Sequence, residues 1–474
     1  MEYDFLKSAL ASEGAQFSTQ GFLEWFNACA QASYFEVNEI PLAQTSGWCL
    51  EPEGKGLCHE SGKFFSVQGL DVEIDGPVHQ RWQQPIIVQP EIGILGILVK
   101  NFKGVPHFLM QLKMEPGNIN RAQLSPTVQA TKSNYSRVHN GKVPPYLDYF
   151  IERKGHVIAD QLQSEQGARF FRKRNRNMII GVEEEIPLKE NFCWLTLAQI
   201  HQLYCCSNLV NMDARTVLSM VSFALLGSRD SLSTINGDGF SWDLLHSLAL
   251  GENGLLPTEA LISWLVDLKV SYEIKTRLIP LNQLQDWHVS DEDIRHKRGQ
   301  YFSVIGVTTR AGNREVSEWC QPLLKHDEIG LVGLLCQKID GVLHFLVCGR
   351  LEPGYIDGIE VGPTVSCSEP ERRVQAGDGP RFIEYFVNPD AAVVRCSWEL
   401  SEEGGRFYHF RNRYMLVELA QNETIDITQG YAWATYGQLH ALVRHSLYLN
   451  VELRSLMAGL PLAGRAVSSC ASFC

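Results

Sequence analysis

An arginine- and asparagine-rich segment occurs twice in the sequence and could bind phosphate. FFRKRNRNMII at 170–180 and FYHFRNRYMLV at 407–417 both end in apolar runs and are predicted to be strands. Alternate strand residues share a face, so Arg174 is expected beside Arg176, and Arg411 beside Arg413. Paired guanidinium groups bind phosphate oxygens, and two on one face suit a diphosphate. A charged, solvated edge strand or a nucleic-acid patch would explain the same pattern, although the net charge of −12 disfavours nucleic acid.

The same repeated segment contributes further candidate binding residues. Asn175 and Asn412 lie between the paired arginines and could add hydrogen-bond donors. Arg169 and Arg406 stand at matching positions upstream and are also expected to bind substrate.

Two matching turns place a carboxylate at the end of an apolar strand. In MEPGN (114–118) and LEPGY (351–355), the Pro-Gly pair fits the central positions of a type II turn and is interpreted as structural. The preceding Glu115 and Glu352 could each act as a general base if burial or neighbouring charges tune them.

A polar segment, SPTVQATKSNYSRVHNG at 125–141, could line a pocket for a sugar and a base. It contains Thr127, Gln129, Asn134, Tyr135 and His139, and so many polar side chains are costly to bury without hydrogen-bond partners. A solvated loop explains the segment almost as well. The second copy keeps Pro-Thr-Val, with Thr364, and loses most of the rest, which favours the first copy as the catalytic one.

These segments belong to two copies of one domain. HESGKFFSVQG (59–69) matches HKRGQYFSVIG (296–306), and GARFFRKRNRNMII (167–180) matches GGRFYHFRNRYMLV (404–417), both at an offset of 237 positions. So long a period indicates a duplicated domain rather than a solenoid. We place the boundary in the Gly/Ser/Asp-rich stretch 227–239, which gives domains 1–236 and 237–474.

Each half is predicted to be an α+β domain, with a mixed sheet between helices. Apolar residues at helical spacing predict an opening helix around Phe22 and Phe26, and another around Leu261 and Leu265. Closing helices are expected at 194–203 and 433–442, and further helices near Asn211 and Asn450.

Composition and missing motifs exclude several classes of protein. The 13 cysteines are scattered without a CxxC pair, and no apolar stretch has the length of a transmembrane helix. The first residues lack the apolar core of a secretory signal, so a cytoplasmic protein is expected. No dinucleotide fingerprint, P-loop or HExxH motif occurs, and REVSE at 314–318 keeps only the core of a Nudix metal-binding box. Chemistry without a metal or other cofactor is therefore expected.

Taken together, these blocks resemble the NDP-hexose 2,3-dehydratase family over nearly the whole chain. The resemblance rests on QPIIVQPEIGILGILVK, GVPHFLMQLKMEPGN, QLSPTVQATKSNYSRVH and NLVNMDARTVLSM in the first half, and on LEPGYID and GGRFYHFRNRYMLVE in the second. It implies that each half is similar to the Nudix hydrolase fold without its metal box. It also implies a homodimer with two nucleotide-sugar pockets per subunit, one of them catalytic.

The family resemblance further implies dehydration of a dTDP-4-keto-6-deoxy sugar, whose product a partner ketoreductase reduces. On this basis Glu115 or Tyr149 is expected to be the base, and Tyr135 or His139 the acid. Arg174 and Arg176 would hold the diphosphate. A Nudix-like sugar-nucleotide hydrolase and a non-catalytic nucleotide-sugar binder are the alternatives.

Overall fold

Each half of the chain is built around a seven-stranded mixed sheet, seen in a computed structural model that describes residues 3–51, 54–131, 143–223, 239–251, 254–312, 317–389 and 392–462. In both sheets one central pair of strands, β6 with β11 and β18 with β24, is parallel. The predicted α+β class and the repeated plan are therefore confirmed. The first sheet comprises β6 (Ile94–Phe102), β7 (Val105–Met114), β8 (Ala122–Ser125), β9 (Val128–Ala130), β10 (His156–Ser164), β11 (Arg174–Val182) and β12 (Phe192–Leu195). The second comprises β18 (Gly330–Ile339), β19 (Val342–Leu351), β20 (Ile359–Gly362), β21 (Val365–Cys367), β22 (Ala392–Ser401), β24 (Arg411–Leu419) and β25 (Tyr431–Thr435).

The opening helices form where apolar spacing predicts them. Helix α2 (Thr19–Ala32) buries Phe22 and Phe26, and α9 (Thr258–Ser271) buries Leu261 and Leu265. The other helices are α1 (Phe5–Leu10), α4 (Leu147–Ile151), α5 (Leu197–Leu203), α6 (Met212–Leu218), α8 (Gly239–Ala249), α10 (Pro370–Ala376), α11 (Glu384–Val387), α12 (Tyr436–Leu442) and α13 (Val451–Gly459). Within the described ranges, no helix is both long and apolar enough to cross a membrane.

The closing helices begin later than predicted. Trp194 and Trp433 lie in strands β12 and β25, because Thr196 and Thr435 form capping boxes that start α5 and α12 only after these strands. Helices α6 and α13 begin as expected, each capped by an asparagine side chain.

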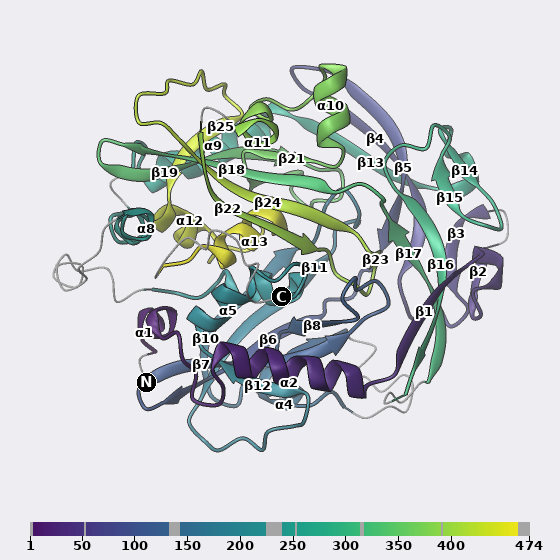
Figure 1. Cartoon of the computed structure of the whole chain (residues 1–474). Coiled ribbons are helices and arrows are strands. Elements are labelled where there is room, and N and C mark those ends of the chain that lie inside the picture. The colour runs from purple at the N-terminus through teal and green to yellow at the C-terminus, as the bar shows by residue number, and fades with distance from the viewer. Residues whose placement is uncertain are drawn as a thin grey trace.

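The two halves exchange strands in two smaller sheets. Strand β1 (Phe35–Ile40) of the first half pairs with β16 (Ser303–Ala311) of the second, as Figure 1 shows. Reciprocally, β13 (Glu273–Ile279) of the second half pairs with β4 (Ser66–Asp75) of the first. These sheets also contain β2 (Trp48–Leu50), β3 (Gly56–His59), β5 (Gln80–Val88), β14 (Trp287–Val289), β15 (Ile294–His296), β17 (Glu318–Lys325) and β23 (Phe407–Tyr408). The predicted boundary stretch, apart from Gly239, lies outside the described residues, and the division at 236 stays a prediction.

The Glu-Pro-Gly turns join the halves through backbone hydrogen bonds. The Gly117 N–H donates to the Gly404 carbonyl at 2.7 Å, and the Gly354 N–H donates to the Gly167 carbonyl at 2.8 Å. A Cβ on Gly117 would lie 1.6 Å from the Phe407 carbonyl oxygen, which leaves no room for any side chain. The predicted type II turn is wrong, since neither Gly117 nor Gly354 has the positive φ that it requires. Glycine is needed here for the close approach of two backbones.

Two buried arginines cross the same interface in opposite directions. Arg215 of α6 donates to the Ser401 carbonyl at 2.8 Å, and Arg454 of α13 donates to the Ser164 carbonyl at 2.6 Å. Both arginine side chains are almost completely buried. Each half therefore satisfies backbone carbonyls of the other, and the two halves are expected to fold as one unit.

We expect Gly117→Ala to destabilise the protein by about 3 kcal/mol, because the added methyl group must push the turn away from Phe407. Chemical denaturation would measure the change. Gly430→Ala is the matched control, since a Cβ there meets nothing within 4 Å and φ is not positive. Equal midpoints for both variants would contradict the packing argument.

Glu360 is a buried acid whose counterpart in the first half is Gln123. Ser164 donates to the Glu360 carboxylate, and Gln123 donates to Ser401 in the matching position. Burial raises the pKa of Glu360 to about 8, so the folded protein holds this proton longer than the unfolded chain does. Its contribution to stability is therefore present at low pH and is lost as pH rises from about 4.5 to about 8.

Glu360→Gln removes this titration. As pH rises from 4.5 to 8.5, we expect the unfolding free energy of the Glu360→Gln variant to increase by about 4 kcal/mol relative to that of the wild type. Denaturation curves across this range would measure the difference. A constant difference between the two proteins would contradict the prediction.

Candidate active site

Glu115 presents a free carboxylate oxygen at the end of β7. One oxygen lies 3.1 Å from the Lys113 ammonium nitrogen and accepts a hydrogen bond from the Gln129 amide at 3.0 Å. The other oxygen is buried and has no hydrogen-bond partner in the described part of the chain. An unsatisfied buried acceptor of this kind is costly unless a ligand pairs with it.

The second half supplies two charged groups to this site. The loop that docks on the Glu115 turn carries Glu403 and Arg406. Arg406 lies over the Phe65 ring at 4.2 Å from its centroid and donates to the Gln89 side chain at 3.1 Å. The guanidinium group is thus fixed by residues of the first half.

Two further carboxylates, those of Glu165 and Asp213, lie in the same region. Asn175 donates to one oxygen of Glu165 at 2.6 Å, and the other oxygen is buried without a partner among the described residues. Burial, followed by the charge of Glu403, raises the pKa of Glu165 to about 7. Burial also raises the pKa of Asp213 well above its ordinary value, with contributions from Glu403, Glu165 and Glu115. We call this set the first cluster: Lys113, Glu115, Gln129, Glu165, Lys173, Asp213, Glu403 and Arg406.

The second half contains a matching second cluster, formed by Arg169, Arg350, Glu352, Tyr355, Glu402 and Glu452. Arg169 comes from the first half and lies over the Phe302 ring at 4.4 Å. Arg350 donates to one oxygen of Glu352 at 3.0 Å, and the backbone N–H of Ala168 donates to the other. Both oxygens of Glu352 are therefore occupied, unlike those of Glu115.

Two substitutions further distinguish the clusters. Gln166 stands where the first cluster has Glu403, and Phe410 stands where it has Lys173. The second cluster has therefore lost one carboxylate and one ammonium group. The first cluster keeps the larger number of groups that can transfer protons.

The arginine-rich strands form as predicted, but their side chains separate onto two faces. Asn175 and Asn412 contact Glu165 and Glu402 of the clusters. On the other face, Arg176 binds both oxygens of Asp160 at 2.5 and 2.6 Å.

A different position is paired in the second half, since Arg411 is the counterpart of Arg174 and Arg413 is that of Arg176. Arg411 binds Glu399 at 2.7 Å, whereas Arg413 is exposed and Arg174 is half-buried. A diphosphate at these arginines would have to compete with carboxylates, and their predicted role stays untested.

Several other predicted residues lie apart from the clusters or outside the described ranges. The Thr127 and Thr364 hydroxyls each join two strands of their sheet, accepting from one backbone N–H and donating to one carbonyl. Tyr149 donates to Glu184 at 2.7 Å, and burial, followed by this hydrogen bond, raises its pKa to about 12. Asn134, Tyr135 and His139 lie outside the described residues.

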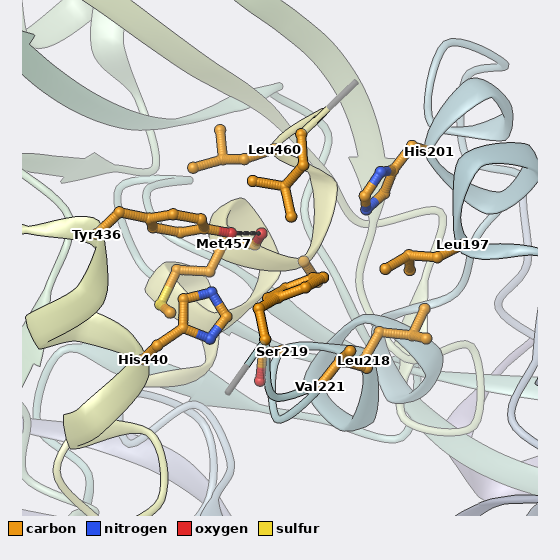
Figure 2. A pocket seen from close by; sticks show the side chains of 12 residues that line it. Leu197, His201, Leu218, Ser219, Val221, Tyr436, His440, Met457 and Leu460 are labelled. Carbon is orange, nitrogen blue, oxygen red and sulfur yellow. Dashed lines mark hydrogen bonds between the residues drawn. The ribbon is translucent and has the colours of Figure 1, made fainter. Parts of the chain in front are cut away.

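An apolar pocket between α5 and α12 shares no residue with either cluster. Figure 2 shows His201 and His440 on opposite sides of this pocket, with a hydrogen bond from Tyr436 to the Met457 carbonyl. Burial lowers the pKa of His201 to about 4 and of His440 to about 3, so both imidazoles are neutral at pH 7. Such weak bases are poorly suited to proton abstraction.

Acidic side chains that could hold a metal ion gather at one place in the described ranges. Glu73, Asp75 and His79 lie near the β4–β5 hairpin. Asp75 already contacts His79 at 2.6 Å and Lys275 at 3.7 Å on the surface. These ordinary surface ion pairs account for the group without a metal.

Sequence reasoning missed most of the first cluster. Glu165, Asp213 and Glu403 each lie near a repeated block, and Asp213 has the acidic counterpart Glu452. The available signal for Glu165 and Asp213 was an acidic residue that recurs, as Glu402 and Glu452, beside the repeated Gly-x-Arg-Phe and Asn-x-x-x-Arg patterns. Glu403 has no acidic counterpart. Lys113 and Lys173 have no such signature.

Comparisons with known proteins agree with the duplicated architecture. A family model described as NDP-hexose 2,3-dehydratase matches residues 19–221 and again residues 258–460. A dTDP-4-dehydro-6-deoxy-alpha-D-glucopyranose 2,3-dehydratase of Saccharopolyspora spinosa is 43% identical over 96% of this chain and 94% of its own length. Proteins with the same description from Amycolatopsis orientalis and Streptomyces violaceoruber are 41% and 40% identical, over 95% and 93% of this chain and 92% and 96% of their own lengths. Since one family matches both halves and these relatives span almost the whole chain, the protein belongs to the NDP-hexose 2,3-dehydratase family.

Proposed function

We propose that this protein removes water across C2 and C3 of dTDP-4-dehydro-6-deoxy-alpha-D-glucopyranose, giving a 3,4-diketo-2,6-dideoxy sugar. The relatives named above support the substrate and the reaction. The observation that carries the mechanism is the free, buried oxygen of Glu115 in a cluster assembled from both halves.

The chemistry needs a base, an acid and a polar environment for developing charge. The C4 ketone acidifies the C3 hydrogen, which the base removes to give an enolate. The enolate electrons form the C2–C3 double bond and expel the C2 oxygen, which leaves as water once protonated. The resulting enol gains a proton at C2 and loses one from the C3 hydroxyl to give the diketone.

Glu115 is the proposed base. Its free oxygen can accept a proton, while Lys113 and Gln129 hold the other oxygen in place. Tyr149 is the weaker candidate, because its hydroxyl is engaged by Glu184 and its pKa is raised to about 12. Among the arginines, Arg406 is favoured for the diphosphate, since it is fixed within the first cluster and no carboxylate of the described ranges is bound to its nitrogens.

The remaining proposals rest on the family resemblance and on the repeated plan. Each half would adopt a Nudix-like fold, supported by its mixed sheet flanked by helices. The protein would act as a cytoplasmic homodimer, and the unstable diketone would pass to a ketoreductase.

The role of Glu115 is tested by Glu115→Gln. We expect turnover to fall about 1,000-fold, because glutamine keeps the contacts but cannot accept the C3 proton. Mass spectrometry of products formed with EDTA, NADPH and a matching 3-ketoreductase would measure turnover. Product formed at the wild-type rate would exclude Glu115 as the base. Loss of intact dTDP-sugar to hydrolysis products would instead indicate a hydrolase.

Arg406 and Arg169 occupy matching positions in the first and second clusters, so the same substitution at each allows the clusters to be compared. We expect Arg406→Ala to weaken dTDP binding to the catalytic site and to lower kcat/KM about 100-fold, through loss of a charge-assisted contact worth about 3 kcal/mol. Arg169→Ala makes the same change in the second cluster, and we expect a much smaller effect on kcat/KM. Calorimetry and steady-state kinetics would measure both. The reverse ranking would place catalysis in the second cluster.

A further inference from the structure

The elimination requires a proton donor close to the base. The hydrogen taken from C3 and the hydroxyl lost from C2 are on adjacent ring carbons. An acid that protonates the departing oxygen must therefore approach the same edge of the sugar as Glu115 or the edge next to it. This inference rests on the proposed function and identifies the second proton-transfer group.

Glu403 and Glu115 converge on the side of Gly405 where a side chain would stand. A Cβ on Gly405 would lie 2.5 Å from one carboxylate oxygen of Glu403 and 3.6 Å from the Glu115 oxygen that Lys113 and Gln129 hold. These two oxygens can be no further apart than the sum of these distances, and the free oxygen of Glu115 belongs to the same carboxylate. The two carboxyl groups are therefore close enough to act as acid and base on neighbouring carbons.

The second cluster lacks both features. Ala168 occupies the position of Gly405, so a methyl group fills the corresponding space, and Gln166 occupies the position of Glu403. A glutamine amide cannot act as a carboxylic acid. The acid and the glycine beside it therefore occur together, in the cluster whose glutamate has a free oxygen.

The surroundings of Glu403 favour its protonated form. Glu115 faces it from the end of β7, and Asp213 faces it from α6. Lys113, Lys173 and Arg406 oppose this effect, but burial is the largest influence and raises the pKa of the Glu403 carboxyl.

The other two carboxyl groups are less suitable. Glu165 is engaged by Asn175, and Asp213 is only 2% exposed. Glu403 is less deeply buried than Asp213.

We propose that Glu403, supplied by the second half, is the general acid that protonates the C2 oxygen. As the enolate electrons form the C2–C3 double bond, the C2–O bond breaks and the Glu403 carboxyl proton moves to the departing oxygen. Water leaves, and Glu403 becomes a carboxylate. The catalytic pair is thus divided between the two halves, with the base from the first and the acid from the second.

Glu403→Gln separates this role from that of the base. We expect turnover to fall at least about 100-fold, while exchange of the C3 hydrogen with D2O, followed by NMR on dTDP-4-dehydro-6-deoxy-glucose, continues because Glu115 is intact. A substrate carrying fluorine in place of the C2 hydroxyl needs little acid assistance, so its elimination by Glu403→Gln should approach the wild-type rate. Glu318→Gln, which removes an exposed carboxylate of β17, is the control for loss of charge.

Wild-type elimination of the natural substrate by Glu403→Gln would overturn the proposal. Loss of both C3 exchange and fluoride elimination, with dTDP binding retained, would also overturn it, since Glu403 would then act in proton abstraction. The native glutamine at position 166 indicates that the matching site accepts this side chain, and circular dichroism would verify folding. If wild-type protein itself fails to dehydrate the substrate, the proposed function fails instead, whatever the variant does.

Discussion

The structure depends on the contact between each Glu-Pro-Gly turn and the Gly-x-Arg-Phe loop of the opposite half. Backbone hydrogen bonds at 2.7 and 2.8 Å hold the two turns, at a distance where Gly117 and Gly354 allow no side chain. Because each glutamate lies only two residues before its glycine, the same contact fixes Glu115 and Glu352 against residues of the other half. The contact that packs the two halves together therefore also assembles the candidate active site.

This arrangement explains why the halves remain intertwined. Exchange of β1 and β13 and the reciprocal burial of Arg215 and Arg454 all act across one pseudo-twofold interface. Buried charges are tolerated only when hydrogen bonds compensate for the lost hydration, and here the compensating groups come from the opposite half. Separating the halves would expose unsatisfied polar groups on both.

Duplication has also allowed the clusters to diverge. Glu115 keeps a free oxygen, whereas Glu352 is held by Arg350 and by the backbone at Ala168. The first cluster concentrates four carboxylates, and burial favours the protonated form of three of them, Glu165, Asp213 and Glu403. Lys113, Lys173 and Arg406 limit the electrostatic cost. This environment can support both a proton donor and a proton acceptor.

The sequence by itself determined the duplication, the α+β class, the opening helices and the position of Glu115 at a strand end, because these follow from local periodicity and from the repeat. It also revealed the family, since the resemblance spans both copies. Only the tertiary structure decided that Glu403 and Arg406 join Glu115, and that Arg176 faces Asp160 while Asn175 faces the cluster. These pairings join residues far apart in the chain or on different faces of a strand. They are set by how the two halves pack, which local sequence patterns do not encode.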